Sequence, residues 1–156
     1  MLQRELIYLD DDLTSRFEVI RKMSEDASNF GMITDVNTYV KAVLKREEEI
    51  PTTVGLNVGI PHGKSEAVKD PFITFMRTKN PFIWDERNME KVQLIFMIGV
   101  PTDQTGTLHL KILAQISRNL MDQTFRNMLL EVDSIDDAYR LLKCIEENIY
   151  AEEKGR

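Results

Sequence analysis

The sequence is poor in the residues that build disulfide frameworks, metal centres and nucleic-acid surfaces. A single cysteine, Cys144, excludes an intramolecular disulfide bond, and its apolar helical surroundings indicate packing rather than chemistry. With only two histidines beside it, the chain lacks the ligand set of a zinc site. We therefore expect no metal. The formal net charge is −6 and no basic stripe stands out, so we expect no nucleic-acid partner either.

Two further absences concern membranes and common catalytic chemistry. The chain has no apolar run of about 18 residues and no signal-like N-terminus, which predicts a cytoplasmic protein without membrane insertion. It contains no GxGxxG, GxxxxGK, HExxH or GxSxG motif, so dinucleotide, P-loop, zinc-protease and serine-hydrolase chemistries are not indicated. We expect no cofactor.

Apolar positions recur at three- and four-residue steps in five stretches, which predicts five amphipathic helices. Their expected first residues or caps are Ser15 (with Glu18 in a capping box), Asp35, Thr107, Asp122 and Ser134. The third helix follows a polar loop at 102–107, and the side chains that we expect it to turn inward are Leu110, Leu113, Ala114, Ser117 and Leu120. The charged tail at 152–156 is expected to fray.

Strand-like segments are interspersed among these helices. Residues 6–9 predict an edge strand, and residues 72–78 and 82–84 predict two strands separated by a turn at Pro81. After a polar turn, the nearly continuous apolar run at 92–100 predicts a central strand buried on both faces. The whole pattern predicts one α/β domain over 1–156, with a mixed, mostly buried β-sheet flanked by helices on both faces.

The stretch GLNVGIPHGKS, residues 55–65, is the one most suggestive of chemistry. Its short apolar run ends at Pro61, which cannot donate to a sheet ladder, so we expect a loop to begin at His62. Gly63 would remove side-chain bulk beside the ring and let the backbone approach a bound group. With an ordinary pKa of about 6.5, the imidazole can act as a neutral nucleophile near neutral pH. The alternative is a surface-loop histidine without a chemical role.

Three other polar positions allow both a functional and a structural interpretation. Arg46 lies in a charged helix end at 45–49, where it is either solvated or directed towards an anion. His109 falls in the first turn of a helix, where free N–H groups bind anions, unless it is a plain surface residue. The acidic run at 10–12 suggests a metal site, but a solvated helix start favoured by the helix dipole explains it better.

Four segments carry a resemblance to a known family. They are the RE pair at Arg46 and Glu47, the glycine-rich stretch with His62 sixteen positions after Arg46 (62 − 46), PFIWDERNMEKVQLIFMIGVP at 81–101, and LHLKILAQISRNL at 108–120. In this order and spacing they resemble the enzyme IIA domains of the fructose–mannitol class, PTS EIIA type 2, of the bacterial phosphoenolpyruvate-dependent sugar phosphotransferase system. The resemblance puts the core of the domain at about 6–150.

The resemblance implies a mechanism and partners. His62 would accept a phosphoryl group from the phosphocarrier HPr on its tele nitrogen, Nε2. It would pass the group to a cysteine of a IIB component, which serves a membrane IIC permease. Arg46 and His109 would stabilise the transferred group without a metal. Because HPr and IIB must reach the same histidine, their docking surfaces should overlap, with an apolar rim at Phe82 or Trp84 as a candidate.

Two alternatives share part of this interpretation. A regulatory IIA protein of the nitrogen-related type would use the same histidine but signal by phosphorylation-dependent protein binding. A plain α/β interaction module would not be phosphorylated at all. Transfer to a IIB cysteine distinguishes the first alternative, and phosphorylation itself distinguishes the second.

Overall fold

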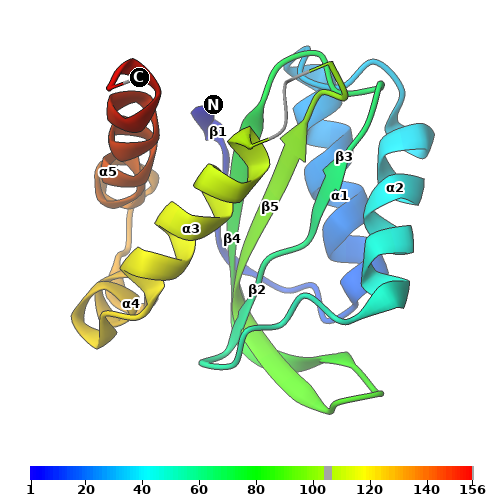
Figure 1. The fold of residues 1–156 in the computed structure, drawn as a ribbon. Coiled ribbons are helices and arrows are strands. Elements are labelled where there is room, and N and C mark those ends of the chain that lie inside the picture. Colours follow the sequence, from blue (N-terminus) through cyan, green and yellow to red (C-terminus); the bar gives the residue numbers. More distant parts are fainter. Residues whose placement is uncertain (104–106, 156) are drawn as a thin grey trace.

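A five-stranded mixed sheet separates two layers of helices in the computed structural model, which describes residues 1–103 and 107–155 (Figure 1). Its strands are β1 (Leu2–Asp11), β2 (Val58–Gly59), β3 (His62–Lys64), β4 (Phe72–Asp85) and β5 (Glu90–Val100). The spatial order is β1-β4-β5-β2, and β3 also pairs with β5. β4 and β5 are antiparallel, β1 is parallel to β4, and β2 and β3 are parallel to β5. The predicted mixed sheet, with β1 at its edge and β5 inside it, is therefore confirmed.

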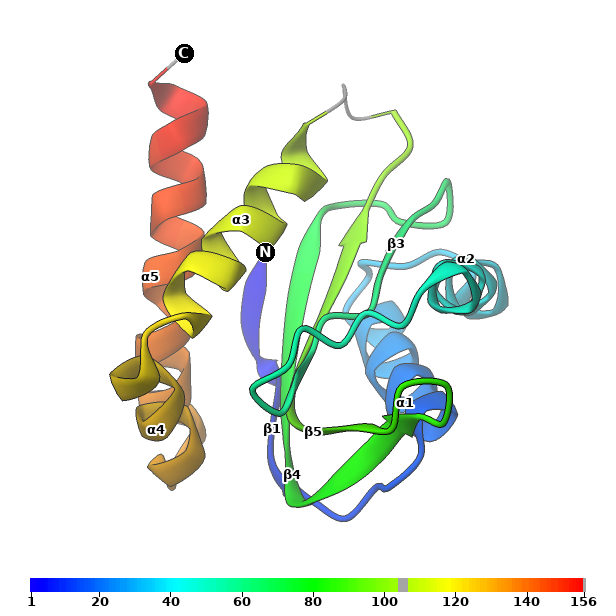
Figure 2. The same ribbon diagram turned by 60° about the horizontal axis from the view of Figure 1, so that its bottom comes forward.

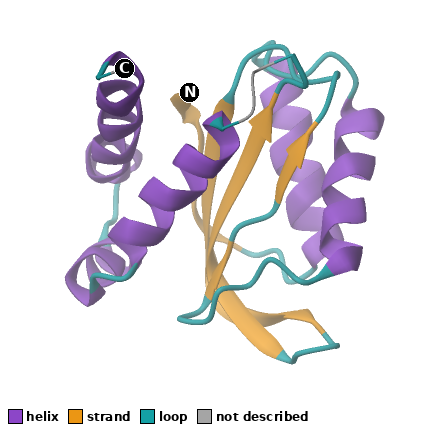
Figure 3. Ribbon diagram, viewed as in Figure 1, coloured by secondary structure: helices purple, strands orange, loops and turns teal. Residues whose placement is uncertain are grey.

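Helices cover both faces of the sheet, as the sequence predicts (Figures 2 and 3). One face carries α1 (Arg16–Asn29) and α2 (Val36–Glu49), and the other carries α3 (Leu108–Leu120), α4 (Gln123–Glu131) and α5 (Ile135–Lys154). Side chains of β5 alternate between the two cores: Ile95 and Met97 join the first, and Leu94, Phe96 and Ile98 join the second. Within the described ranges, none of the helices combines the length and apolarity that a membrane span requires.

Short polar side chains begin four of the five helices, as predicted. Ser15, Asp35, Asp122 and Ser134 each accept a hydrogen bond from a backbone N–H in the first turn of the helix that follows. Each cap satisfies a donor that the helix leaves unpaired, and so fixes where the helix starts. Thr107 directly precedes α3 but makes no side-chain capping bond, and residues 104–106 of the predicted polar loop lie outside the described residues.

β4 continues through the predicted turn at Pro81, so the expectation of two separate strands is wrong. From Arg77 to Phe82, β4 advances five residues (82 − 77) while β5 advances only two, from Leu94 to Val92 (94 − 92). The surplus residues form a bulge, in which Pro81 need not donate to the ladder. The strand therefore tolerates the proline that suggested a break.

β1 is longer than the strand predicted at 6–9, and it includes Asp10 and Asp11. Asp10 forms an ion pair with the buried Arg77, and Asp11 forms one with Lys22. Two of the three carboxylates in the run are therefore paired at a strand end, and the run does not form the predicted helix start, because α1 begins only at Arg16.

The inward face of α3 differs from the predicted one. The buried side chains of α3 are Ile112, Gln115, Ile116 and Leu120, whereas Leu110 is 55% exposed. Apolar residues lie on several sides of this helix, so periodicity alone did not distinguish neighbouring stripes.

Lys111 of α3 forms an ion pair with Glu153 near the end of α5. The predicted fraying is wrong for residues 152–154, and Arg156 lies outside the described residues.

Two neighbouring glycines make the close packing between α2 and the sheet possible. Gly63 of β3 pairs with Gly99 of β5, and a Cβ atom at Gly63 would lie 3.0 Å from Val43 Cγ2 of α2. A Cβ atom at Gly99 would lie 2.2 Å from the ring of Phe72. The rings of Tyr39 and Phe72 fill the space at this contact, with their centroids 5.5 Å apart. This packing fixes where the side chains of α2 stand relative to β3.

Replacing Gly99 by alanine should destabilise the fold, because the new methyl group would overlap the buried Phe72 ring. We expect Gly99→Ala to lower the free energy of unfolding by about 1–3 kcal/mol, the usual cost of overpacking a core. Gly155→Ala is the matched control, since a Cβ there meets nothing closer than 3.4 Å. Urea denaturation followed by circular dichroism measures both variants, and unchanged stability of Gly99→Ala would show that the ring moves aside without cost.

Candidate functional site

His62 begins β3, directly after the proline that separates β2 from β3. The carbonyl of Pro61 accepts a hydrogen bond from Ile98 N of β5 at 3.0 Å. The prediction that a loop begins at His62 is therefore wrong, because the edge strand resumes there and His62 pairs with Ile98. A residue without an N–H is tolerated at this position because its carbonyl makes the bond to β5.

Gly63 has a packing role that the sequence did not reveal. Successive residues of a strand face opposite sides, so Gly63 faces α2 while His62 and Lys64 face away from it. A side chain at Gly63 would meet Val43 and Tyr39. The glycine is therefore explained by the contact between α2 and β3, rather than by the predicted approach of the backbone to a bound group.

The ring of His62 is held in one tautomer by its own segment of backbone. Its Nδ1 lies 2.8 Å from the carbonyl oxygen of Ile60. A carbonyl oxygen can only accept a hydrogen bond, so Nδ1 carries the proton and Nε2 carries the lone pair. Nε2 is therefore the nucleophilic atom of this half-buried ring.

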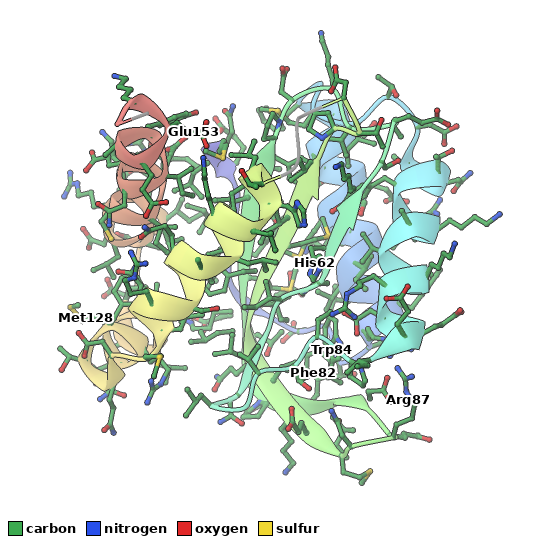
Figure 4. All side chains as sticks on the ribbon, viewed as in Figure 1. His62, Phe82, Trp84, Arg87, Met128 and Glu153 are labelled. Atoms are coloured by element: carbon green, nitrogen blue, oxygen red, sulfur yellow. The ribbon has the colours of Figure 1, made fainter. Side chains whose placement is uncertain are left out.

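Arg46 and His109, the other two predicted site residues, line the same hollow as His62. The hollow has a volume of about 250 Å³ and is walled by α2, β3, β5 and α3. Arg46 comes from the last turn of α2 and His109 from the first turn of α3, and Lys64 of β3 is also in the wall. Figure 4 shows His62 between α2 and α3, and Figures 1 and 2 show β3 between the same two helices. A nucleophilic nitrogen among cationic and N–H groups suits the transfer of an anionic group.

A comparison with protein families identifies the family of the chain. The model described as "Phosphoenolpyruvate-dependent sugar phosphotransferase system, EIIA 2" matches residues 1–144. The chain belongs to this EIIA family. The resemblance seen in the sequence is confirmed, and the domain is a phosphotransferase component of that system.

Relatives of this EIIA domain include fructose-type components. It is 36% identical over 130 residues to the PTS system fructose-specific EIIA component of Haloferax volcanii, covering 83% of this chain and 84% of that protein. It is 31% identical over 119 residues to a PTS system fructose-like EIIA component of Escherichia coli, covering 76% and 79%. The fructose-specific EIIABC component of Bacillus subtilis is 31% identical over 136 residues, 87% of this chain but only 21% of that longer protein.

Solved structures share the fold of this EIIA domain. Nitrogen regulatory protein IIA-Ntr from Neisseria meningitidis gives a TM-score of 0.82 at 26% identity, covering 90% of this chain and 95% of that one. IIA mannitol from Escherichia coli gives 0.77 at 23% identity, covering 91% and 99%. The predicted α/β architecture is thus the architecture of known EIIA domains.

The surroundings of His62 favour its neutral form. Loss of solvent around the half-buried ring lowers the pKa of His62 below its ordinary 6.5, and the nearby Arg46 and His109 lower it further. The hydrogen bond to Ile60 and the charge of Glu47 act in the opposite direction, but the net shift is downward. A neutral imidazole keeps the Nε2 lone pair available for attack on phosphorus.

Arg46 is anchored at the end of its own helix. Its Nη1 donates a hydrogen bond of 2.8 Å to the carbonyl of Ile50, four residues later, where α2 has already ended. This bond satisfies a carbonyl beyond the helix terminus and keeps the guanidinium at the wall of the hollow. Arg46 thus lies both at the helix end and in the wall of the hollow, and its role towards an anion stays a prediction.

Glu47 lies next to Arg46 and is buried, which the sequence did not reveal. The run at 45–49 was predicted to be solvated, yet Glu47 is fully buried while Glu48 and Glu49 are exposed. Tyr39, Val43 and Glu47 follow one another at four-residue steps on the face of α2 that packs on the sheet. That spacing was the available signal, and the negative charge obscured it.

The suggested docking rim at Phe82 and Trp84 is wrong. Phe82 is only 7% exposed and Trp84 only 3%, and their rings lie 6.1 Å apart in the core beneath the β4–β5 hairpin. Figure 4 shows both residues at this end of the sheet, with Arg87 nearby. They stabilise the fold and present no apolar surface to a partner.

Phosphoryl acceptance by His62 should fall on acidification, with a midpoint below 6.5. Only the neutral ring has a free Nε2 lone pair, and burial lowers the pKa at which that lone pair is protonated. The rate should therefore be constant above about pH 7 and decrease as the pH falls through the lowered pKa. An NMR titration of the ¹⁵N-labelled ring, with circular dichroism as a control for folding at each pH, measures this pKa. A midpoint above 6.5 would contradict the assignment.

Proposed function

We propose that this EIIA domain is a cytoplasmic histidine phosphocarrier, in which His62 accepts a phosphoryl group from phosphorylated HPr and passes it to a cysteine of a IIB component. The observation that carries the proposal is the meeting of His62, Arg46 and His109 at one hollow. The family match supports the reaction class, and the fructose-type relatives support a role in sugar uptake and phosphorylation.

The phosphoryl group would move in two in-line displacements. In the first, Nε2 of His62 attacks phosphorus, a P–Nε2 bond forms, and the P–N bond to the donor's histidine breaks. In the second, a IIB thiolate attacks phosphorus, a P–S bond forms, and the P–Nε2 bond breaks, which returns the lone pair to His62. The hydrogen bond from Nδ1 to Ile60 holds the ring in place through both steps.

Arg46 and His109 would stabilise the charge on the transferred group. Phosphoryl transfer asks the protein for positioning and for neutralisation of the equatorial oxygens. The planar guanidinium of Arg46 offers a permanently charged, forked set of donors, which a lysine does not reproduce. His109 adds a ring N–H at the first turn of α3, where an anion is already favoured.

Related proteins support the proposed acceptor. One relative is the 2-O-alpha-mannosyl-D-glycerate-specific EIIABC component of Escherichia coli, and a solved structure with this fold is a complex of enzyme IIA mannitol and phosphorylated enzyme IIB mannitol. A IIB component, and through it a IIC permease, are therefore the partners that we propose. HPr as donor rests on the family resemblance. Both partners must reach Nε2, so their footprints should overlap at the mouth of the hollow.

Incubation with phosphoenolpyruvate, enzyme I and HPr should add the mass of one phosphoryl group to the parent protein and none to His62→Ala. The variant should fold, because His62 lies on an edge strand and is only half-buried. Adding IIB should then discharge the parent onto a cysteine, whereas a purely regulatory protein would remain phosphorylated. Mass spectrometry measures both steps, and labelling of His62→Ala would overturn the site assignment.

Arg46→Lys and His109→Ala should slow phosphoryl transfer without abolishing it. A charge-assisted hydrogen bond is worth about 1.5–3 kcal/mol, so losing one should slow transfer by roughly 10- to 100-fold. Lys45→Ala is the matched control, because this exposed neighbour of Arg46 is not in the wall of the hollow. A rapid-quench time course compares the three variants, and parental rates in both site variants would show that these side chains are idle.

A further inference from the structure

Glu47 is a fully buried carboxylate, and its hydrogen bonds come from two neutral side chains and one backbone group. Thr52 donates to it twice, from its backbone N at 3.2 Å and from its hydroxyl Oγ1. Trp84 donates from Nε1 at 3.1 Å. Hydrogen bonds to the charged form stabilise it, so this donor set can hold a buried negative charge.

These bonds connect Glu47 to the ring of His62. The carbonyl of Thr52 accepts a hydrogen bond from Ile60 N at 3.0 Å, and the carbonyl of Ile60 accepts one from His62 Nδ1 at 2.8 Å. One continuous chain of hydrogen bonds therefore runs from the carboxylate through Thr52 and Ile60 to the imidazole. Because the carboxylate holds both donors of Thr52, the position of the Thr52 carbonyl depends on Glu47.

The carboxylate and the backbone of Glu47 both hold the helix turn that carries Arg46. Trp84 of β4 donates to the carboxylate, and Arg87 at the tip of the β4–β5 hairpin donates to the backbone carbonyls of Glu47 and Glu48 at 2.5 and 2.7 Å. Figure 4 shows Trp84 and Arg87 at the hairpin end of the sheet, close to the last turn of α2. The hairpin thus ties the end of α2 to the sheet beside the hollow.

We propose that Glu47 is a positioning residue for phosphoryl transfer, which acts through Thr52 and Ile60 on the ring of His62 and fixes the helix turn that carries Arg46. The inference rests on the proposed function of His62. Glu47 does not touch the phosphoryl group in this scheme. It sets the orientation of His62, which bonds to the phosphoryl group, and the location of Arg46, which stabilises the charge of that group.

The charge of Glu47 adds an electrostatic effect to this geometry. When Nε2 of His62 takes up phosphorus while Nδ1 keeps its proton, the ring becomes cationic, and a nearby buried carboxylate stabilises that form. Neutral imidazole is then the leaving group in the next transfer. Arg46 on α2, His109 on α3 and Lys64 on β3 line the hollow and oppose the cationic form, which leaves Glu47 as the carboxylate that favours it.

Glu47→Gln is the direct test, because it keeps the shape of the side chain and removes the charge and one acceptor. In single-turnover transfer from phosphorylated HPr, we expect the saturating rate to fall by roughly 10- to 100-fold. The HPr concentration at half-saturation should stay unchanged, since Glu47 is buried. The pKa of His62 should fall below that of the parent, because a negative charge that raises it is lost.

Glu48→Gln, an exposed neighbour with the same change in net charge, is the control and should transfer at the parental rate. Thr52→Val keeps the charge but removes the hydroxyl donor, so it should slow transfer even if Glu47→Gln fails to fold. A folded Glu47→Gln with the parental rate and His62 pKa would overturn the proposal, as would a parental rate in Thr52→Val. A parent protein that takes up no phosphoryl group would instead refute the proposed function.

Discussion

The close approach of α2 to the edge of the sheet is the constraint on which the site depends. Gly63 leaves no side chain between β3 and the helix, and Gly99 of β5 leaves room for the ring of Phe72, which packs against Tyr39 of α2. Because the helix is seated this closely, its last turn reaches the hollow that His62 enters from β3. A helix displaced outward by the thickness of one side chain would carry its arginine away from the hollow, whatever the sequence of that turn.

In the proposed function, the ring of His62 acts first as a nucleophile and then as a leaving group. Acceptance needs a neutral ring with a free Nε2, which burial and the neighbouring cationic groups favour. Release is easier from a ring that keeps a proton on Nδ1, which the Ile60 carbonyl holds at 2.8 Å. Backbone geometry therefore settles the tautomer, while the surrounding charges tune the ring between its two roles.

The sequence predicted the elements well and their edges less well. Periodicity and capping residues were sufficient to predict where the helices lie, and the apolar run of β5 was sufficient to predict a buried inner strand. Cys144 of α5, half-buried against the core, has the packing role that its surroundings suggested. Two of the errors have a common cause: Pro81 in a bulge of β4 and Pro61 between β2 and β3 need not donate to the ladder, because of pairings that depend on distant residues. The burial of Glu47 likewise depends on Trp84, 37 residues later in the chain.

The central claim is that the hydrogen bond of Nδ1 leaves Nε2 as the atom that forms the bond to phosphorus. Long-range ¹H–¹⁵N correlation spectra of the phosphorylated, ¹⁵N-histidine-labelled protein test this claim most directly, because coupling to phosphorus identifies the bonded nitrogen. The account predicts phosphorus coupling at Nε2 of His62 and a proton retained on Nδ1. Phosphorus bonded to Nδ1, or to either nitrogen of His109, would contradict it.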